Sequence, residues 1–132
     1  MDERLDAVRE LWRTYREDGV EKAIPLLHPE VEFVAHDGRV FNGHDGVREF
    51  FAEFDRRGEV FTASPYSFEL REPDLIVIGH RRIRSQEGTR GDYLFFVHSF
   101  VDGRVSRIAA HATKDAALTD IAARYRGQAW PS

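Results

Sequence analysis

Two histidines and an arginine recur at alternate positions on two segments that we expect to pair as strands. With Asp102-Gly103 as a two-residue hairpin turn, His98 lies directly opposite Arg107, and His111 shares their face. An imidazole changes its charge close to neutral pH, so it can accept and return a proton. A neighbouring guanidinium can stabilise the enolate that forms when a proton is removed beside a carbonyl group. We therefore predict catalytic roles in acid–base chemistry for His98, Arg107 and His111.

Aromatic side chains and a second arginine extend this predicted site. With Glu87-Gly88 at the centre of the preceding turn, Arg81 lies opposite Leu94 and on the same face as His98. Aromatic residues of the first and third expected helices would lie above that face and border the space for a ligand. The residues that we predict to bind a ligand are Trp12, Tyr15, Phe51, Arg81 and Phe96.

The same polar and aromatic residues also have a structural interpretation. A single histidine on an apolar face is often a hydrogen-bonded core residue, and aromatic residues of an amphipathic helix often only pack in the core. The two arginines could pair with Glu32, Glu69 or Asp92, because a buried guanidinium needs a carboxylate partner. A one-residue bulge in the last hairpin would exchange the two faces of a strand. Both interpretations stay open here.

Metal and cofactor chemistry lacks the residues that it requires. The chain has no cysteine, which excludes thiolate nucleophiles, zinc–thiolate sites and disulfides. His36-Asp37-Gly38 and His44-Asp45-Gly46 repeat one tripeptide, but a turn and a helix start explain both occurrences. The chain has no HExxH zinc motif, no GxSxG nucleophile elbow and no glycine-rich phosphate loop. We expect no metal and no cofactor.

Length and charge limit the class of protein and its partners. The chain has 132 residues and a net charge of −4, which fits one domain and disfavours nucleic acid or an anionic membrane as a partner. Its apolar runs are far shorter than the roughly 20 residues that a membrane span needs. The charged N-terminal segment MDERLDAVRE does not resemble a secretory signal, so we expect a cytoplasmic protein.

The hydrophobic periodicity predicts the elements that position these residues. Apolar residues at helical spacing predict a first helix ending at Gly19, a short second helix ending at Pro29 and a third over 44–57. From Glu59 onward the period is two, which predicts strands. The expected strands cover 31–35, 39–41, 60–63, 66–70, 75–84, 93–101 and 104–112. Thr113 begins a last helix that ends at Gly127.

Helices followed by long strands with short turns predict the α+β class. We expect one strongly curved, mostly antiparallel sheet wrapped over the three helices of the N-terminal half, with an additional C-terminal helix. A sheet of this curvature leaves a pocket between itself and the helices. No linker or repeat interrupts the chain, so we expect a single domain over 1–127 and a short tail over 128–132.

Four segments spread over nearly the whole chain carry a resemblance to a known superfamily. They are HPEVEFVAHDGRVFNGHDGVREFF, LIVIGHRRIRS, FFVHSFVDGRVSRI and KDAAL. Their most characteristic parts are the helix entry at 43–47, the hairpin at 100–105 and the pair Ala117-Leu118. They resemble the SnoaL-like branch of the nuclear transport factor 2-like superfamily. The resemblance implies a cone-shaped α+β barrel with a deep apolar cavity.

This resemblance also carries expectations for activity and for individual residues. The superfamily includes polyketide cyclases, ketosteroid isomerases, scytalone dehydratases and limonene epoxide hydrolases beside many members without catalytic activity. The resemblance makes His98 the counterpart of the histidine that SnoaL-type cyclases use, and Arg107 and His111 fall where those cyclases have an aspartate. His36 and Asp37 fall one or two positions beyond the base of the isomerases.

Two functions follow as alternatives. The first is a cofactor-independent acid–base enzyme, of isomerase, cyclase or dehydratase type, that acts on a small apolar carbonyl compound. The second is a module that binds a small apolar ligand or dimerises without catalysis. For both we expect a homodimer, formed through the sheet face that carries Tyr93, Phe95 and Val97 and points away from the helices.

Overall fold

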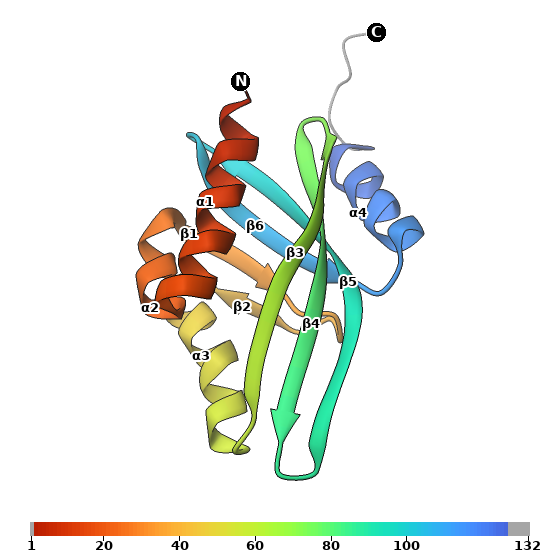
Figure 1. The fold of residues 1–132 in the computed structure, drawn as a ribbon. Helices are drawn as coiled ribbons and strands as arrows, with labels where there is room; N and C mark the ends of the chain where they lie inside the picture. The colour runs from red at the N-terminus through yellow and green to blue at the C-terminus, as the bar shows by residue number, and fades with distance from the viewer. Residues whose placement is uncertain (1, 127–132) are drawn as a thin grey trace, which may run out of the picture.

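Residues 2–126, the part that this computed structural model describes, form four α-helices, one short 3₁₀ helix and six strands (Figure 1). In chain order the elements are α1 (Glu3–Asp18), α2 (Val20–Ala23), the 3₁₀ helix η1 (Ile24–Leu26), β1 (Leu27–Val34), β2 (Val40–Asn42), α3 (Gly43–Arg56), β3 (Val60–Arg71), β4 (Asp74–Ser85), β5 (Gly88–Val101), β6 (Arg104–His111) and α4 (Lys114–Arg126). The predicted helix end at Gly127 and the predicted tail over 128–132 lie outside the described residues.

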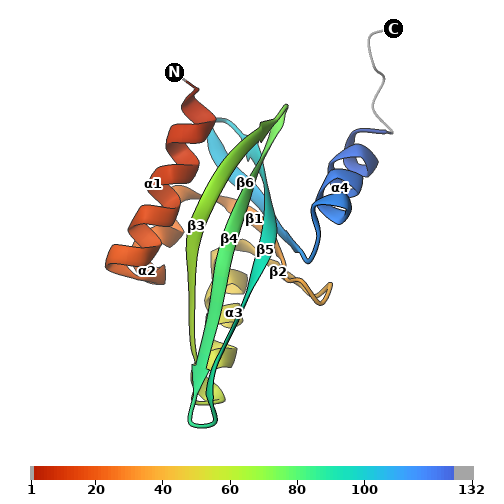
Figure 2. The same ribbon diagram turned by 45° about the vertical axis from the view of Figure 1, so that its right-hand side comes forward.

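All strands of this part of the chain belong to one curved sheet with the order β2-β1-β6-β5-β4-β3. Neighbouring strands are antiparallel except β1 and β6, which run parallel. Helices α1, α2 and α3 lie on one side of the sheet and α4 lies on the other (Figure 2). The predicted α+β class and the curved sheet over three helices are confirmed, with the sheet open between its edge strands β2 and β3.

Apolar stripes on the helices explain how they pack against the sheet. Val8, Leu11 and Trp12 are the buried apolar residues of α1, and α3 buries Val47, Phe50 and Phe54. These side chains join the inner side chains of the strands in one core cluster. Because burial of each large apolar side chain is worth about 1.5–3 kcal/mol, this shared core holds the three helices on the concave face of the sheet.

Strand β3 is longer than predicted. Ser64 and Pro65, which we expected to separate two strands, lie inside it. Proline lacks the N–H group that a central strand would use for pairing, but β3 is an edge strand and pairs only with β4. A register shift between Pro65 and Ser67 absorbs the remaining irregularity.

The hairpin of β5 and β6 contains a bulge that changes the predicted faces. Its turn is formed by Asp102 at a φ of 52° and Gly103 at a φ of 78°, and Val101 pairs with Arg104 as predicted. Phe100 still pairs with Val105, but Ser99 pairs with Arg107, so Ser106 is an inserted residue that shifts the register by one. The prediction that Arg107 and His111 share the face of His98 is therefore wrong, because one inserted residue turns every later side chain of β6 over.

Helix α4 covers part of the convex face of the sheet. Ile76, Val97 and Ala117 form a second small core, against which Phe95, Leu118 and Ile121 pack. Val97, which we expected on an uncovered apolar face, is fully buried there, whereas Tyr93 is 54% exposed. The predicted apolar face is therefore only partly uncovered.

No helix within residues 2–126 has both the length and the apolar character needed to cross a membrane.

Candidate functional site

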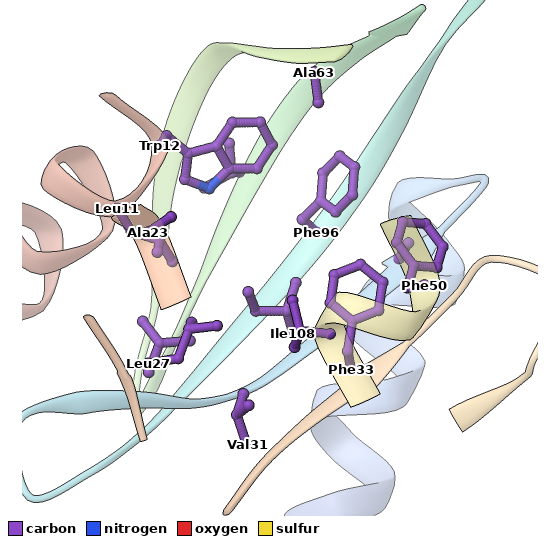
Figure 3. Packing of buried hydrophobic residues seen from close by; sticks show 14 of the residues in the cluster. Leu11, Trp12, Ala23, Leu27, Val31, Phe33, Phe50, Ala63, Phe96 and Ile108 are labelled. Atoms are coloured by element: carbon purple, nitrogen blue, oxygen red, sulfur yellow. The ribbon is translucent and has the colours of Figure 1, made fainter. Parts of the chain in front are cut away.

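An apolar pocket lies between the helices and the concave face of the sheet. It has a volume of about 80 Å³. Figure 3 shows several of its wall residues, with Trp12, Leu27, Phe96 and Ile108 around one space. Its lining residues are all apolar or aromatic: Leu11, Trp12, Tyr15, Val20, Ala23, Ile24, Leu27, Phe33, Val47, Phe51, Phe61, Ala63, Phe96 and Ile108. Four of the five residues predicted to bind a ligand belong to this wall, and Arg81 does not.

Trp12 forms one end of the pocket and presents only carbon atoms to it. A Cβ atom at Gly79 of β4 would lie 2.9 Å from Trp12 Cη2, so the absence of a side chain there lets the indole lie against the sheet. The Trp12 and Phe96 rings meet edge to face at 5.1 Å. The polar atom Nε1 donates its proton to His98 Nε2 at 3.0 Å.

His98 is a fully enclosed residue of the core. Its Nε2 accepts the proton from Trp12, so the neutral ring carries its own proton on Nδ1, which donates to the Phe96 carbonyl at 3.0 Å. Burial lowers the pKa of His98 to about 4. Neither ring nitrogen is left to exchange a proton with a ligand, and His98 does not line the pocket. The geometry matches the structural interpretation of this histidine.

Tyr15, Phe51 and Phe61 separate the pocket from an outer groove. The Tyr15 and Phe51 rings lie 5.5 Å apart, and Phe51 and Phe61 lie 5.7 Å apart. The Tyr15 hydroxyl donates to the Phe61 carbonyl at 3.2 Å, and burial raises the pKa of Tyr15. The groove has a volume of about 450 Å³ and its polar lining includes Arg16 and Asp55. It shares these three residues, together with Val20 and Ala63, with the pocket. The three rings therefore stand at the mouth of the pocket.

Arg81 lies on the concave face, as predicted, but away from the apolar pocket. The turn before β5 is formed by Gln86-Glu87, so Arg81 pairs with Asp92 and not with Leu94. The Arg81 guanidinium donates to both carboxylate oxygens of Asp92, at 2.9 and 2.6 Å. Its Nη1 also donates to His36 Nδ1 at 3.1 Å. Arg81 lines a second, polar-rimmed pocket at this end of the sheet.

Arg107 and His111 lie on the convex face, where Asp120 of α4 joins them. Arg107 donates to Glu32 at 2.9 Å and to both oxygens of Asp120, at 3.0 and 3.2 Å. His111 Nε2 donates to Asp120 Oδ2 at 2.9 Å. Burial opposes ionisation of Asp120, but its bonds to His111 and Arg107 outweigh this effect and lower its pKa to about 2. This cluster attaches α4 to the sheet, on the side opposite to the pocket.

The three residues predicted to be catalytic are therefore not brought together. His98 is enclosed on the concave side, while Arg107 and His111 bind α4 on the other side. Their catalytic roles stay predictions that this geometry does not support. Sequence reasoning missed Phe61 and Ala63 as wall residues, although the period of two along β3 places both on one face.

Within residues 2–126, no group of three or more histidine, aspartate or glutamate side chains has an arrangement that could hold a metal ion.

Comparisons with known proteins identify the fold. No family model matches the chain, and no curated protein matches its sequence. TerC, crystallised with polyporic acid, matches with a TM-score of 0.74 and 21% identity over 89% of this chain and 97% of its own. An NTF2-like protein of unknown function from Burkholderia pseudomallei matches with a TM-score of 0.73 and 20% identity over 90% and 97%.

A further solved structure of similar fold is a complex with a small organic molecule. Rv0760c from Mycobacterium tuberculosis, in complex with estradiol-17β-hemisuccinate, matches with a TM-score of 0.69 and 16% identity over 87% of this chain and 97% of its own. At these identities the likeness shows the fold alone. The chain has the fold of nuclear transport factor 2-like proteins, in agreement with the resemblance drawn from its sequence.

Proposed function

We propose that this protein binds a small, largely apolar molecule in the pocket between α1–α3 and the sheet. The observation that carries the proposal is the chemistry of the wall. All fourteen lining residues are apolar or aromatic. The indole N–H of Trp12 and the hydroxyl of Tyr15 are both bonded to other protein groups. Such a wall favours apolar surface over water, because water would find no hydrogen-bond partner there.

The outer groove supplies a route for this molecule. The rings of Tyr15, Phe51 and Phe61 border both the groove and the pocket. Rotation of one of these half-buried side chains would join the two volumes of about 450 and 80 Å³. The ligand then places its apolar part against Trp12 and Phe96.

Two solved structures with a similar fold give independent support to this proposal. TerC was crystallised with polyporic acid, and Rv0760c was crystallised with estradiol-17β-hemisuccinate. In both cases a protein of this fold was crystallised with a small organic molecule. These molecules support the class of ligand that we propose and do not identify the ligand of this chain.

Of the two functions considered from the sequence, the geometry favours ligand binding without catalysis. Acid–base catalysis needs a titratable group within hydrogen-bond reach of the bound molecule. Tyr15 is the only lining residue with such a group, and its hydroxyl is already engaged by the Phe61 carbonyl. The proposed role is therefore carriage, sensing or sequestration of a small apolar molecule.

We also propose that the protein is a homodimer that uses the uncovered part of the convex sheet face. Tyr66 and Tyr93 are 74% and 54% exposed there, and their rings meet edge to face at 5.9 Å. A second copy would bury both rings. Sedimentation at micromolar concentration should give twice the 15.2 kDa mass of the chain, and Tyr93→Arg should give a monomer. A wild-type monomer would refute the dimer.

The test of ligand binding is an NMR titration with toluene. Replacement Trp130→Phe leaves Trp12 as the only indole, so that its N–H resonance reports on the pocket. We expect saturable shifts of this resonance in the parent protein. Ala63→Leu places three extra carbon atoms in the wall and should abolish the shifts, whereas Ala116→Leu, on an exposed position of α4, should not. Equal shifts in both variants would refute the proposal.

A further inference from the structure

We propose a second binding site in this protein, one that takes a small organic carboxylate. It is a pocket of about 150 Å³ at the end of the sheet where β1 ends and where β4 and β5 approach their turn. We call it the arginine vestibule, because Arg39, Arg57, Arg81 and Arg90 belong to its lining together with His36. It shares Phe33, Phe61 and Phe96 with the apolar pocket but has a charged rim that the pocket lacks, so the inference does not rest on the function proposed above.

The floor of the arginine vestibule is apolar. It contains five phenylalanine residues, together with Ala35, which follows β1, and smaller apolar side chains of β4, β5 and β6: Phe33, Phe50, Phe54, Phe61, Phe96, Ile83, Leu94 and Ala110. Phe33 and Phe50 lie 4.7 Å apart, and Phe54 and Phe61 lie 5.0 Å apart, so the rings form a continuous surface. Most of these side chains are already buried, and a ligand with a ring or a short chain would cover the part of their surface that is still exposed in the vestibule.

Most of the charged side chains that line the rim are guanidinium groups. Asp37 is the one carboxylate residue in the lining. Glu53, Glu59 and Asp92, which pair with the four arginines, are not part of it. A molecule in the vestibule therefore meets four guanidinium groups, each with a carboxylate partner, and one carboxylate, Asp37, which pairs with Arg39 at 3.0 Å. An anionic group on the ligand is the natural complement to this rim.

The carboxylates behind the rim hold three guanidinium groups in place. Asp92 binds Arg81 through two oxygens, and Glu53 binds Arg39 at 2.9 and 3.1 Å. The Arg57 guanidinium lies over the ring of Phe54, 4.7 Å from its centroid, and pairs with a glutamate. Groups that are already ordered lose little conformational freedom when a ligand binds.

Arg90 and His36 have hydrogen-bonding capacity left for the ligand. Among the residues that the structure describes, Arg90 pairs only with Glu59, at 3.4 Å, and that carboxylate already pairs with Arg57 at 2.8 Å. Since a guanidinium has five N–H donors, Arg90 can bind a carboxylate through two of them. His36 accepts from Arg81 on Nδ1, so the neutral ring carries a proton on Nε2 that it can donate.

These features together select an organic carboxylate over an inorganic anion. Phosphate or sulfate would use the guanidinium groups but would leave the phenylalanine floor uncovered. A neutral aromatic molecule would use the floor but would leave the rim without its complement. Benzoate satisfies both, because it has one flat ring and one carboxylate of the geometry that a guanidinium binds through two bonds.

The test compares benzoate with benzamide, which has the same shape and no charge. We expect benzoate to bind at least about tenfold more tightly to the wild-type protein in calorimetric or NMR titration, with an affinity that falls as salt is added. Arg90→Gln removes the least engaged guanidinium, on a side chain that is 65% exposed, and should weaken benzoate binding about tenfold without unfolding the chain. Arg104→Gln, an equal charge change at the exposed β5–β6 turn, should have no effect.

A second pair of variants separates this site from the apolar pocket. Ala110→Leu fills the floor of the arginine vestibule and does not touch the apolar pocket, so it should abolish benzoate binding and leave toluene binding intact. Ala63→Leu should do the reverse. Equal binding of benzoate and benzamide, equal effects of Arg90→Gln and Arg104→Gln, or loss of benzoate binding in Ala63→Leu but not in Ala110→Leu would each overturn the proposal.

Discussion

Trp12 and His98, separated by 86 residues in the chain, share a buried hydrogen bond of 3.0 Å that ties α1 to β5. The indole can only donate, so the bond sets the tautomer of the imidazole and leaves its second nitrogen to the Phe96 carbonyl. The pair turns two polar atoms away from the apolar pocket. It also explains why the histidine that looks catalytic in the sequence serves the stability of the fold.

Removal of His98 should therefore destabilise the protein strongly. His98→Ala leaves the Trp12 N–H without a partner and opens a cavity, for which we expect a loss of about 2–4 kcal/mol. In a domain of this size that corresponds to a decrease of roughly 10 °C in melting temperature. Thermal unfolding measures this decrease in melting temperature. The control is His28→Ala, at a half-buried position of β1. An unchanged melting temperature would contradict the role given to this bond.

Stability should depend on pH through the same residue. Burial lowers the pKa of His98 from 6.5 to about 4, so between these values the unfolded chain binds more protons than the folded chain. The stabilisation is complete above about pH 6.5 and is lost as the pH falls toward 4, with a total on the order of 3 kcal/mol.

Urea unfolding of the wild type and of His98→Gln between pH 4.5 and 8 isolates this contribution, because the other titratable groups are common to both proteins. The difference in unfolding free energy between the two should grow with pH up to about 6.5 and then stay constant. A difference that does not change with pH would show that the pKa of His98 is the same in the folded and the unfolded protein.

The attachment of α4 should depend on Asp120. Asp120→Asn removes the charge that Arg107 and His111 share, and we expect a loss of about 2 kcal/mol together with faster hydrogen exchange of the α4 amides. Asp115→Asn changes the charge of an exposed residue in the first turn of the same helix and serves as the control. Identical exchange in the two variants would count against the cluster as the main attachment of the helix.

Chelation should not affect stability. The residues that the structure describes include no arrangement of histidine and carboxylate side chains suited to a metal ion. We expect the melting temperature in excess EDTA to equal that in its absence, because only a bound metal couples chelation to unfolding. A decrease of several degrees would reveal a metal that the sequence does not suggest.

Periodicity in the sequence was enough to predict the α+β class and the order of helices and strands. Each long element buries one face, so its apolar residues recur with the period of a helix or of a strand. Gly19 and the turn Asp102-Gly103 ended their elements as predicted, since both use backbone conformations that glycine adopts readily. The continuous strand through Pro65 was missed, because the position of β3 at the sheet edge is a property of the whole fold.

The predicted arrangement of His98, Arg107 and His111 on one sheet face differs from the structure by one residue of register. The bulge at Ser106 has no signature in the sequence, yet it moves Arg107 and His111 to the convex face. The partner of His98 could not be predicted either, because Trp12 approaches it only where Gly79 leaves space on β4. By contrast, Trp12, Tyr15, Phe51 and Phe96 were correctly placed around one space, because amphipathic helices must pack their aromatic residues on the sheet.

A crystal structure of the protein soaked with bromobenzene tests the central claim most directly. Bromine has an anomalous signal that locates the bound molecule without any assumption about the site. We predict one dominant peak inside the apolar pocket, bounded by Trp12, Phe96 and Ile108, and its loss in Ala63→Leu. Bromine peaks confined to the convex sheet face or to the outer groove, with none inside the pocket, would contradict the proposed function.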